Sequence, residues 1–207
     1  MFQDREEAAE RIAERLDHHR GKNPLVLAIP RGGVPMGRIV ADRLDGELDI
    51  VLVRKIGAPG NPEFAIGSVD ETGHVELNPG TERFGISEDY IEREADRQLE
   101  TIRERRQRYQ RPPTHAEGRV AILVDDGIAT GATLSAAIRS VRAQSPQTLV
   151  VAVGVAPPPT VERLRGEVDE LVCLEAPADF MAVGQFFRDF RQVDDEEVIA
   201  ALRGEVS

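Results

Sequence analysis

Two adjacent carboxylates are the most informative chemical feature of this chain. Asp125 and Asp126 follow the apolar run 120–124 and precede a turn of small and hydroxyl-bearing residues, Gly127-Ile128-Ala129-Thr130-Gly131-Ala132-Thr133. This order predicts that the acids lie at the carboxyl end of a buried strand. It also predicts that the backbone N–H groups of 127–133 face one concavity at the start of a helix, where anions bind well. Two acids beside such a phosphate cradle suit a sugar phosphate, which carries vicinal hydroxyls and a phosphate.

A second turn has residues that suit anion binding. Arg31, Gly32 and Gly33 follow the apolar run 25–29 and precede a helix predicted over 35–44. Two glycines allow the backbone to approach an anion closely, and a guanidinium can bind two phosphate oxygens at once. Alone, the motif is more typical of a tight turn. Together with the acidic motif about ninety residues downstream, it favours an anion site.

A third element, which is basic, follows the next predicted strand, 48–53. Arg54 and Lys55 lie at its end, and Lys55 is one of only two lysines in the chain. Two cations beside a phosphate-rich ligand offset its repulsion and stabilise charge on a departing phosphate group. The alternative interpretation is a solvated strand end, where such a pair is common.

Residues 121–133 resemble the ribose-phosphate signature of the type I phosphoribosyltransferases over thirteen positions. The resemblance implies that Asp125 and Asp126 hold the 2′- and 3′-hydroxyls of phosphoribosyl pyrophosphate. The alternative is a strand-to-helix turn in which the acids only cap a helix. By the same resemblance the pyrophosphate binds Arg31, Gly32, Gly33, Arg54 and Lys55, and the 5′-phosphate binds Gly127, Ala129, Thr130, Gly131, Ala132 and Thr133, with the threonine hydroxyls as donors.

The implied reaction transfers a phosphoribosyl group to a nitrogenous, nucleobase-like acceptor and releases pyrophosphate. Asp125, Asp126 and Lys55 are the expected catalytic residues, and Mg²⁺ is expected to arrive on the substrate pyrophosphate rather than on protein ligands. Family members that act on 6-oxopurines carry an aspartate where this chain has Ala129. That difference argues against hypoxanthine or guanine as the acceptor. The core resemblance covers roughly residues 20–175.

Two other functions compete with this interpretation. One is a non-catalytic sensor that binds phosphoribosyl pyrophosphate and regulates a partner protein. The other is an unrelated nucleotide-binding α/β protein, which the sequence disfavours because it has neither a Gly-x-Gly-x-x-Gly turn after a strand nor a Gly-Lys-Ser/Thr phosphate loop. Release of pyrophosphate with a panel of nucleobases distinguishes an enzyme from a sensor.

The predicted strands alternate with helices, which indicates an α/β fold with a mostly parallel central sheet flanked by helices. We expect a core over 1–176 that includes a lid loop and helix insertion at 56–118, followed by a small C-terminal hood at 177–207. The segment 56–86 is rich in Gly, Pro and Asn and predicts a long loop with a hairpin (65–69 and 74–77), and 57–67 is the expected lid. Further elements are predicted as helices near 4–16, 87–110, 133–143 and 161–165 and as strands at 148–155 and 168–174.

Composition excludes several classes of protein. The chain has 207 residues and a net charge of −11, which argues against nonspecific nucleic-acid binding. No stretch approaches the roughly 18 apolar residues of a membrane span, and no signal-peptide core is evident. A single cysteine, Cys173, excludes an intrachain disulfide and suits a reducing cytoplasm.

The remaining candidates carry weaker signals. Glu63 and His74 are proton-transfer candidates without spacing evidence, His18 and His19 are expected to face solvent, and no spacing indicates a dedicated metal site. The four phenylalanines of 180–190 either stack on a flat acceptor or, for most of them, pack against the core. A homodimer is expected, because related lids borrow residues across a two-fold axis and the apolar seam of 87–110 needs a partner.

Overall fold

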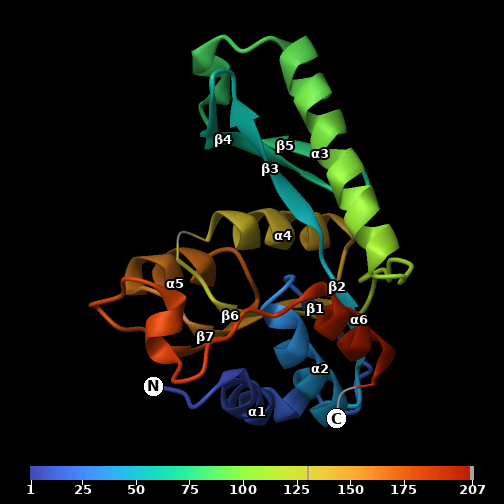
Figure 1. The fold of residues 1–207 in the computed structure, drawn as a ribbon, viewed down its shortest axis with the longest axis vertical. Helices are drawn as coiled ribbons and strands as arrows, with labels where there is room; N and C mark the ends of the chain where they lie inside the picture. The colour runs from blue at the N-terminus through green and yellow to red at the C-terminus, as the bar shows by residue number, and fades with distance from the viewer. Residues whose placement is uncertain (130, 206–207) are drawn as a thin grey trace. The chain divides into compact units, whose positions relative to one another are not determined.

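The computed structural model describes residues 1–129 and 131–205, which form two compact units. The first unit combines Met1–Val51 with the described residues from Arg111 onward, and the second is Leu52–Gln110. The second unit overlaps the lid loop and helix insertion that the sequence predicted at 56–118. Figure 1 labels the helices and strands of both units.

The first unit contains a five-stranded parallel sheet. Its strand order is β2-β1-β6-β7-β8, and every neighbouring pair is parallel. This arrangement confirms the predicted α/β class with a mostly parallel central sheet. The strands are β1 (Leu25–Ala28), β2 (Glu47–Ile50), β6 (Val120–Gly127), β7 (Thr148–Val155) and β8 (Glu170–Glu175).

Helices cover both faces of this sheet (Figure 1). Helices α1 and α2 pack on each other, α1 contacts β7 and β8, and α6 packs on α2, whereas α4 and α5 lie on the other side. None of the helices in the described part of the chain is long and apolar enough to cross a membrane. The helices are α1 (Arg5–Arg15), α2 (Gly33–Arg43), α4 (Ala132–Ala143), α5 (Pro158–Arg165) and α6 (Asp195–Arg203), with 3₁₀ turns η1 (Asp17–His19) and η3 (Val183–Phe186).

In the first unit one expectation was wrong and one helix was missed. The sequence predicted that His18 and His19 both face solvent, but the His19 side chain is only 8% exposed and its Nε2 lies 2.8 Å from Glu170. The other omission is α6, whose N-cap Asp194 forms a capping box with Glu197. The Asp-x-x-Glu spacing that signals such a box was present in the sequence.

The second unit is a small antiparallel sheet with one long helix. Its elements are β3 (Val53–Ala58), β4 (Asn61–Asp70), β5 (Val75–Leu77), the 3₁₀ turn η2 (Thr81–Phe84) and α3 (Glu88–Arg108). The predicted hairpin around residue 72 is confirmed as β4–β5, but the prediction of a long loop over 56–86 was wrong. Two of the glycines lie where strands approach closely: a Cβ on Gly57 would lie 2.7 Å from Pro62, and one on Gly67 would lie 2.5 Å from the Glu76 carbonyl.

Helix α3 does not leave its apolar seam uncovered. Ala95, Leu99 and Ile102 are buried, and α3 packs on β3 and β4 of the same unit. The expectation that this seam needs a second copy of the chain was therefore wrong. The small sheet itself covers the seam.

Candidate active site

The turns after β1 and β6 meet at the carboxyl edge of the parallel sheet. Ala28 is paired with Val124, and the N–H of Ile29 donates to the Val124 carbonyl at 3.0 Å. A Cβ on Gly32 would lie 2.1 Å from Oδ2 of Asp126, and one on Gly33 would lie 2.6 Å from the Val124 carbonyl oxygen. Only glycine fits this approach without a shift, so the structure brings the Arg31-Gly32-Gly33 turn directly against the two acids.

Asp126 is 9% exposed and is bound by an arginine that the sequence did not single out. Arg5, the first residue of α1, approaches Asp126 Oδ2 with Nε at 2.9 Å and with Nη2 at 2.8 Å. The same guanidinium donates to the Arg191 carbonyl at 2.8 Å and lies 4.0 Å above the Phe190 ring. Arg5 is 121 positions from Asp126 in the chain, so no local pattern could have indicated this pair.

The two acids share one positive charge. Burial raises the pKa of Asp125 well above its usual range, and the neighbouring Asp126 charge raises it further. Burial also raises the pKa of Asp126, although the charge and hydrogen bond of Arg5 oppose that rise. Asp125 keeps part of its surface exposed and accepts the N–H of Asp126 at 2.9 Å. Ionisation of both acids is therefore unfavourable, and a ligand whose hydroxyls donate hydrogen bonds to the carboxylates would stabilise the ionised pair.

The loop between β6 and α4 differs from expectation at one amide. The Ile128 N–H donates to the Val155 carbonyl at 2.9 Å, so it does not face an anion. The sequence had predicted that every amide of 127–133 faces one concavity. Thr130 lies outside the described residues.

The start of α4 retains the features of an anion site. Ala132 and Thr133 are the first two residues of the helix, and such amides have no partner within the helix. Gly131 precedes them with φ +77°, a conformation that favours glycine. A Cβ on Gly131 would lie 2.5 Å from a terminal nitrogen of Arg163, so α5 brings a guanidinium beside the loop. No motif in the sequence indicated Arg163.

The Arg31 side chain reaches the C-terminal helix. Its guanidinium lies 3.9 Å from the Asp195 carboxylate at the start of α6, and its side chain is 38% exposed. The structure thus leaves the Arg31 guanidinium partly in solvent, whereas the two glycines that follow lie against the acids.

Arg54 and Lys55 belong to the second unit. They lie within β3 of the antiparallel sheet, so the expectation that they end a strand of the parallel sheet was wrong. Arg54 Nε donates to Gln98 at 2.6 Å, and burial, followed by the charge of Arg105, lowers its pKa. Lys55 Nζ donates to Glu63 at 2.8 Å, and this hydrogen bond lowers the pKa of Glu63.

The phenylalanines of 180–190 mainly pack on other rings. Phe187 is buried, and its ring centroid lies 5.1 Å from Phe2 and 5.0 Å from Phe190. Phe180 and Phe186 stack on each other at 5.7 Å. These contacts favour the packing interpretation over a role in binding a flat acceptor.

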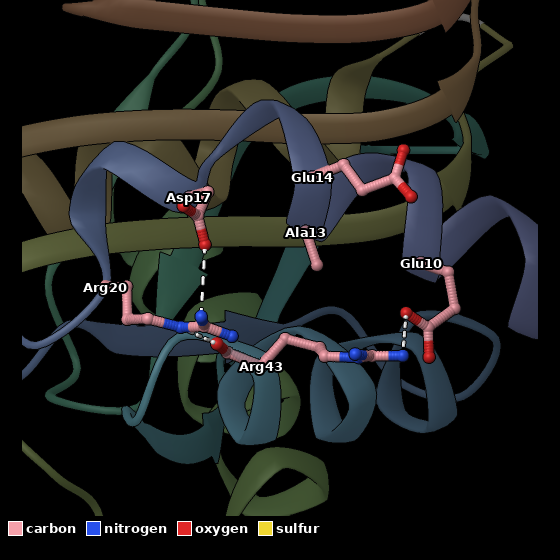
Figure 2. Close-up of a pocket in the computed structure, with 6 residues that line it drawn as sticks. All are labelled: Glu10, Ala13, Glu14, Asp17, Arg20 and Arg43. Atoms are coloured by element: carbon pink, nitrogen blue, oxygen red, sulfur yellow. Dashed lines mark hydrogen bonds and ion pairs between the residues drawn. The ribbon is translucent and has the colours of Figure 1, made fainter.

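A pocket of about 360 Å³ between α1 and α2 is a poor candidate for substrate binding (Figure 2). Its charges largely neutralise each other: Arg43 pairs with Glu10 at 2.7 Å, and Arg20 lies 3.6 Å from Asp17 and donates to the Arg43 carbonyl. The lining residues are Glu10, Ala13, Glu14, Asp17, Arg20 and Arg43.

Comparison with known proteins identifies the sequence family. The family model described as "Phosphoribosyl transferase domain" matches residues 2–190. Two Mycobacterium tuberculosis proteins, from strains CDC 1551 and H37Rv, are 43% identical over 208 residues and are provisionally named phosphoribosyl transferases. The alignment covers 98% of this chain but 46% of each relative, so the chain spans about half the length of the curated relatives it matches.

A solved structure resembles the whole chain. The crystal structure of TT1426 from Thermus thermophilus is 48% identical, with a TM-score of 0.89. The match covers 100% of this chain and 99% of that chain.

Proposed function

We propose that this chain, which belongs to the phosphoribosyl transferase domain family, moves the 5-phosphoribosyl group from phosphoribosyl pyrophosphate to a nitrogenous acceptor. Pyrophosphate is released, and the acceptor is a nucleobase-like heterocycle. The observation that carries this proposal is the close approach of the Gly32-Gly33 turn to Asp125 and Asp126, beside the start of α4. Groups suited to a ribose, a phosphate and a pyrophosphate thus occupy one edge of one sheet.

Each part of the donor has its own binding group in this proposal. Asp125, the more exposed acid, accepts hydrogen bonds from the ribose hydroxyls together with Asp126, whose charge Arg5 balances. The pyrophosphate binds Arg31 and the two glycines after it. The 5′-phosphate binds the loop that leads into α4, through Gly127, Ala129, Thr130, Gly131, Ala132 and Thr133.

The chemical step is a substitution at C1′ of the ribose. A nitrogen of the acceptor forms the new C1′–N bond while the C1′–O bond to pyrophosphate breaks, and the departing pyrophosphate takes the bonding electron pair. The proton of the acceptor nitrogen leaves to a base or to solvent. Positioning of the reactants and stabilisation of the leaving charge provide the rate enhancement, without a covalent enzyme intermediate.

Magnesium fits this site as an ion carried by the substrate. Arg5 already occupies Oδ2 of Asp126, and the pyrophosphate turn offers a guanidinium and backbone groups rather than carboxylates. Mg²⁺ prefers several oxygen ligands and commonly uses substrate phosphates, so the pyrophosphate oxygens would hold it, with Asp125 as the available protein carboxylate. When bound, the ion would neutralise charge on the leaving group.

The role of Lys55 and Arg54 stays a prediction from the family resemblance. Lys55 is half exposed, and its carboxylate partner Glu63 is more exposed still, so this ion pair can be exchanged at little cost. On the proposal, Lys55→Ala lowers the turnover number, while the matched variant Glu63→Gln does not. Equal turnover in Lys55→Ala and the parent chain would remove Lys55 from the catalytic residues.

Three broader expectations also remain proposals. A homodimer now rests on the family resemblance alone, because α3 packs on its own sheet. A core over 1–176 with a hood at 177–207 rests on the sequence pattern. A cytoplasmic location rests on cysteine usage alone, because Cys173 is the single cysteine of the sequence.

Pyrophosphate release tests the enzymatic proposal against a sensor. The chain is incubated with phosphoribosyl pyrophosphate, Mg²⁺ and each member of a panel of nucleobases and related nitrogen heterocycles. A transferase releases pyrophosphate only when a suitable acceptor is present, and Asp125→Asn/Asp126→Asn abolishes the release. Tight binding of the donor without release for any acceptor would instead support the sensor.

A further inference from the structure

Three side chains with metal-ligating atoms converge at the edge of the first unit opposite the acids. His18 and His19 are consecutive residues of η1, just after α1, and Glu170 is the first residue of β8. Strand β8 is parallel to β7, and β7 is parallel to β6. The start of β8 therefore lies at the amino ends of the strands, whereas Asp125 and Asp126 lie at the carboxyl ends. This cluster is therefore separate from the proposed substrate site.

The geometry of the cluster points to one common centre. Nε2 of His18 lies 3.1 Å and Nε2 of His19 lies 2.8 Å from the same oxygen, Oε2 of Glu170. One ligand atom from each residue lies within 4.8 Å of the others, and the two imidazole centroids are 4.1 Å apart. Once the Nε2 protons are displaced, two imidazole nitrogens and one carboxylate oxygen would present lone pairs to the same small volume.

We propose that His18, His19 and Glu170 bind a divalent transition-metal ion of the zinc type. Imidazole nitrogen and carboxylate oxygen are ordinary Zn²⁺ ligands, and three protein ligands leave one position for water in a tetrahedral site. The nitrogen ligands distinguish this ion from Mg²⁺, which prefers oxygen and accompanies the pyrophosphate.

The three side chains are held in place but remain accessible to an ion from solvent. The His19 side chain is 8% exposed, Glu170 29% and His18 54%, so an ion can enter from the His18 side. Among the described residues, His19 Nδ1 is buried and has no hydrogen-bond partner, so the interaction at Nε2 is the polar contact that orients this ring.

A bound ion would have a structural role. It would join the turn after α1 to the first residue of β8, two segments 151 positions apart in the chain. Strand β8 is an edge strand of the parallel sheet, held by hydrogen bonds on one side only. An ion that binds the folded chain alone raises the melting temperature with its concentration, by mass action.

The test uses Zn²⁺ alone, with no phosphoribosyl pyrophosphate present. The full chain is treated with a chelator, and Zn²⁺ binding is measured by isothermal titration together with the melting temperature. Co²⁺ absorption reports whether nitrogen ligands surround the ion. We expect one ion per chain, a higher melting temperature, and affinity at least about tenfold lower in His18→Ala and in Glu170→Gln, since even indirect partners of a metal cost about that much.

Matched variants control for other metal ligands. His74→Ala and His115→Ala remove the two remaining histidines, both exposed, and Cys173→Ser removes the one thiol. These three variants should bind Zn²⁺ like the parent chain. His18→Ala keeps the test valid if Glu170→Gln unfolds, because His18 is the most exposed of the three ligands. No Zn²⁺ binding by the parent chain, or unchanged binding in His18→Ala, would overturn the proposal.

Discussion

At the scale of single residues, Arg5 determines the charge of the candidate site. It is the one cation in contact with the acid pair among the contacts the structure describes, and it approaches Asp126 through two nitrogens. Desolvated acids that share a site raise each other's pKa, and a guanidinium in contact lowers it. Arg5 therefore opposes the rise in the pKa of Asp126 that burial causes, although it lies far from the family signature in the sequence.

Changing Arg5→Gln should make donor binding depend more strongly on pH. Without the guanidinium the pKa of Asp126 rises further, so the protonated acid persists to higher pH. The acid limb of phosphoribosyl pyrophosphate binding should shift upward by roughly 1–3 pH units. Affinity measured by titration calorimetry between pH 5 and 9 checks this shift.

Arg11→Gln is the matched control. Arg11 lies on the same helix, pairs with Glu7 and Glu175, and lies 5.0 Å from the Phe2 ring. Its loss should leave the pH profile unchanged. A parallel loss of affinity at every pH in Arg5→Gln would show that Arg5 acts only through packing.

Asp125→Asn should stabilise the fold at neutral and high pH. The pKa of folded Asp125 lies above the unfolded value of about 3.9, so the fold loses stability as the pH rises from the unfolded pKa to the folded pKa, and the loss is complete above the folded pKa. Asparagine keeps the acceptor for the Asp126 N–H. Urea unfolding should give a gain on the order of 1–2 kcal/mol at pH 8. The gain should disappear near pH 4, and a gain independent of pH would contradict the charge explanation.

At the scale of elements, the turn after β1 requires glycine because it approaches β6 closely. Gly33→Ala would place a methyl group 2.6 Å from the Val124 carbonyl oxygen, which is fixed by strand pairing. Overpacking of this kind costs roughly 1–3 kcal/mol. We expect a lower free energy of unfolding and weaker donor binding, measured by urea denaturation and calorimetry.

Gly166→Ala serves as the comparison for this change. Gly166 follows α5, and an added Cβ would meet the Arg163 carbonyl at an ordinary 3.6 Å. Stability and donor affinity should both stay near the parent values. Equal effects of the two substitutions would indicate that glycine content, rather than the close approach, matters.

The sequence predicted the elements with regular patterns and missed those with mixed signals. The parallel strands are short apolar runs, and β7 was predicted at its observed bounds, 148–155. Most of β3 and the first residues of β4 were missed because glycines and prolines lie at their bulges and close contacts. The strand predicted at 48–53 joined the end of β2 to the start of β3, because apolar residues continue between the two sheets.

At the scale of the whole molecule, the candidate site combines segments that are distant in the chain. The signature indicated the acids and the phosphate loop, and parallel topology explains why the turn after β1 lies beside them. Arg5 and Arg163 could not be predicted, because a guanidinium contributed by a helix on either face leaves no spacing in the sequence. The burial of His19 was missed for a similar reason, since its partner Glu170 is on a distant strand.

The most direct test of the central claim is calorimetric titration of the chain with phosphoribosyl pyrophosphate and Mg²⁺. The account predicts saturable binding by the parent chain that is lost in Asp125→Asn/Asp126→Asn, while circular dichroism shows that the variant remains folded. Absence of binding heat from the parent chain, or equal affinity in the folded double variant, would contradict it.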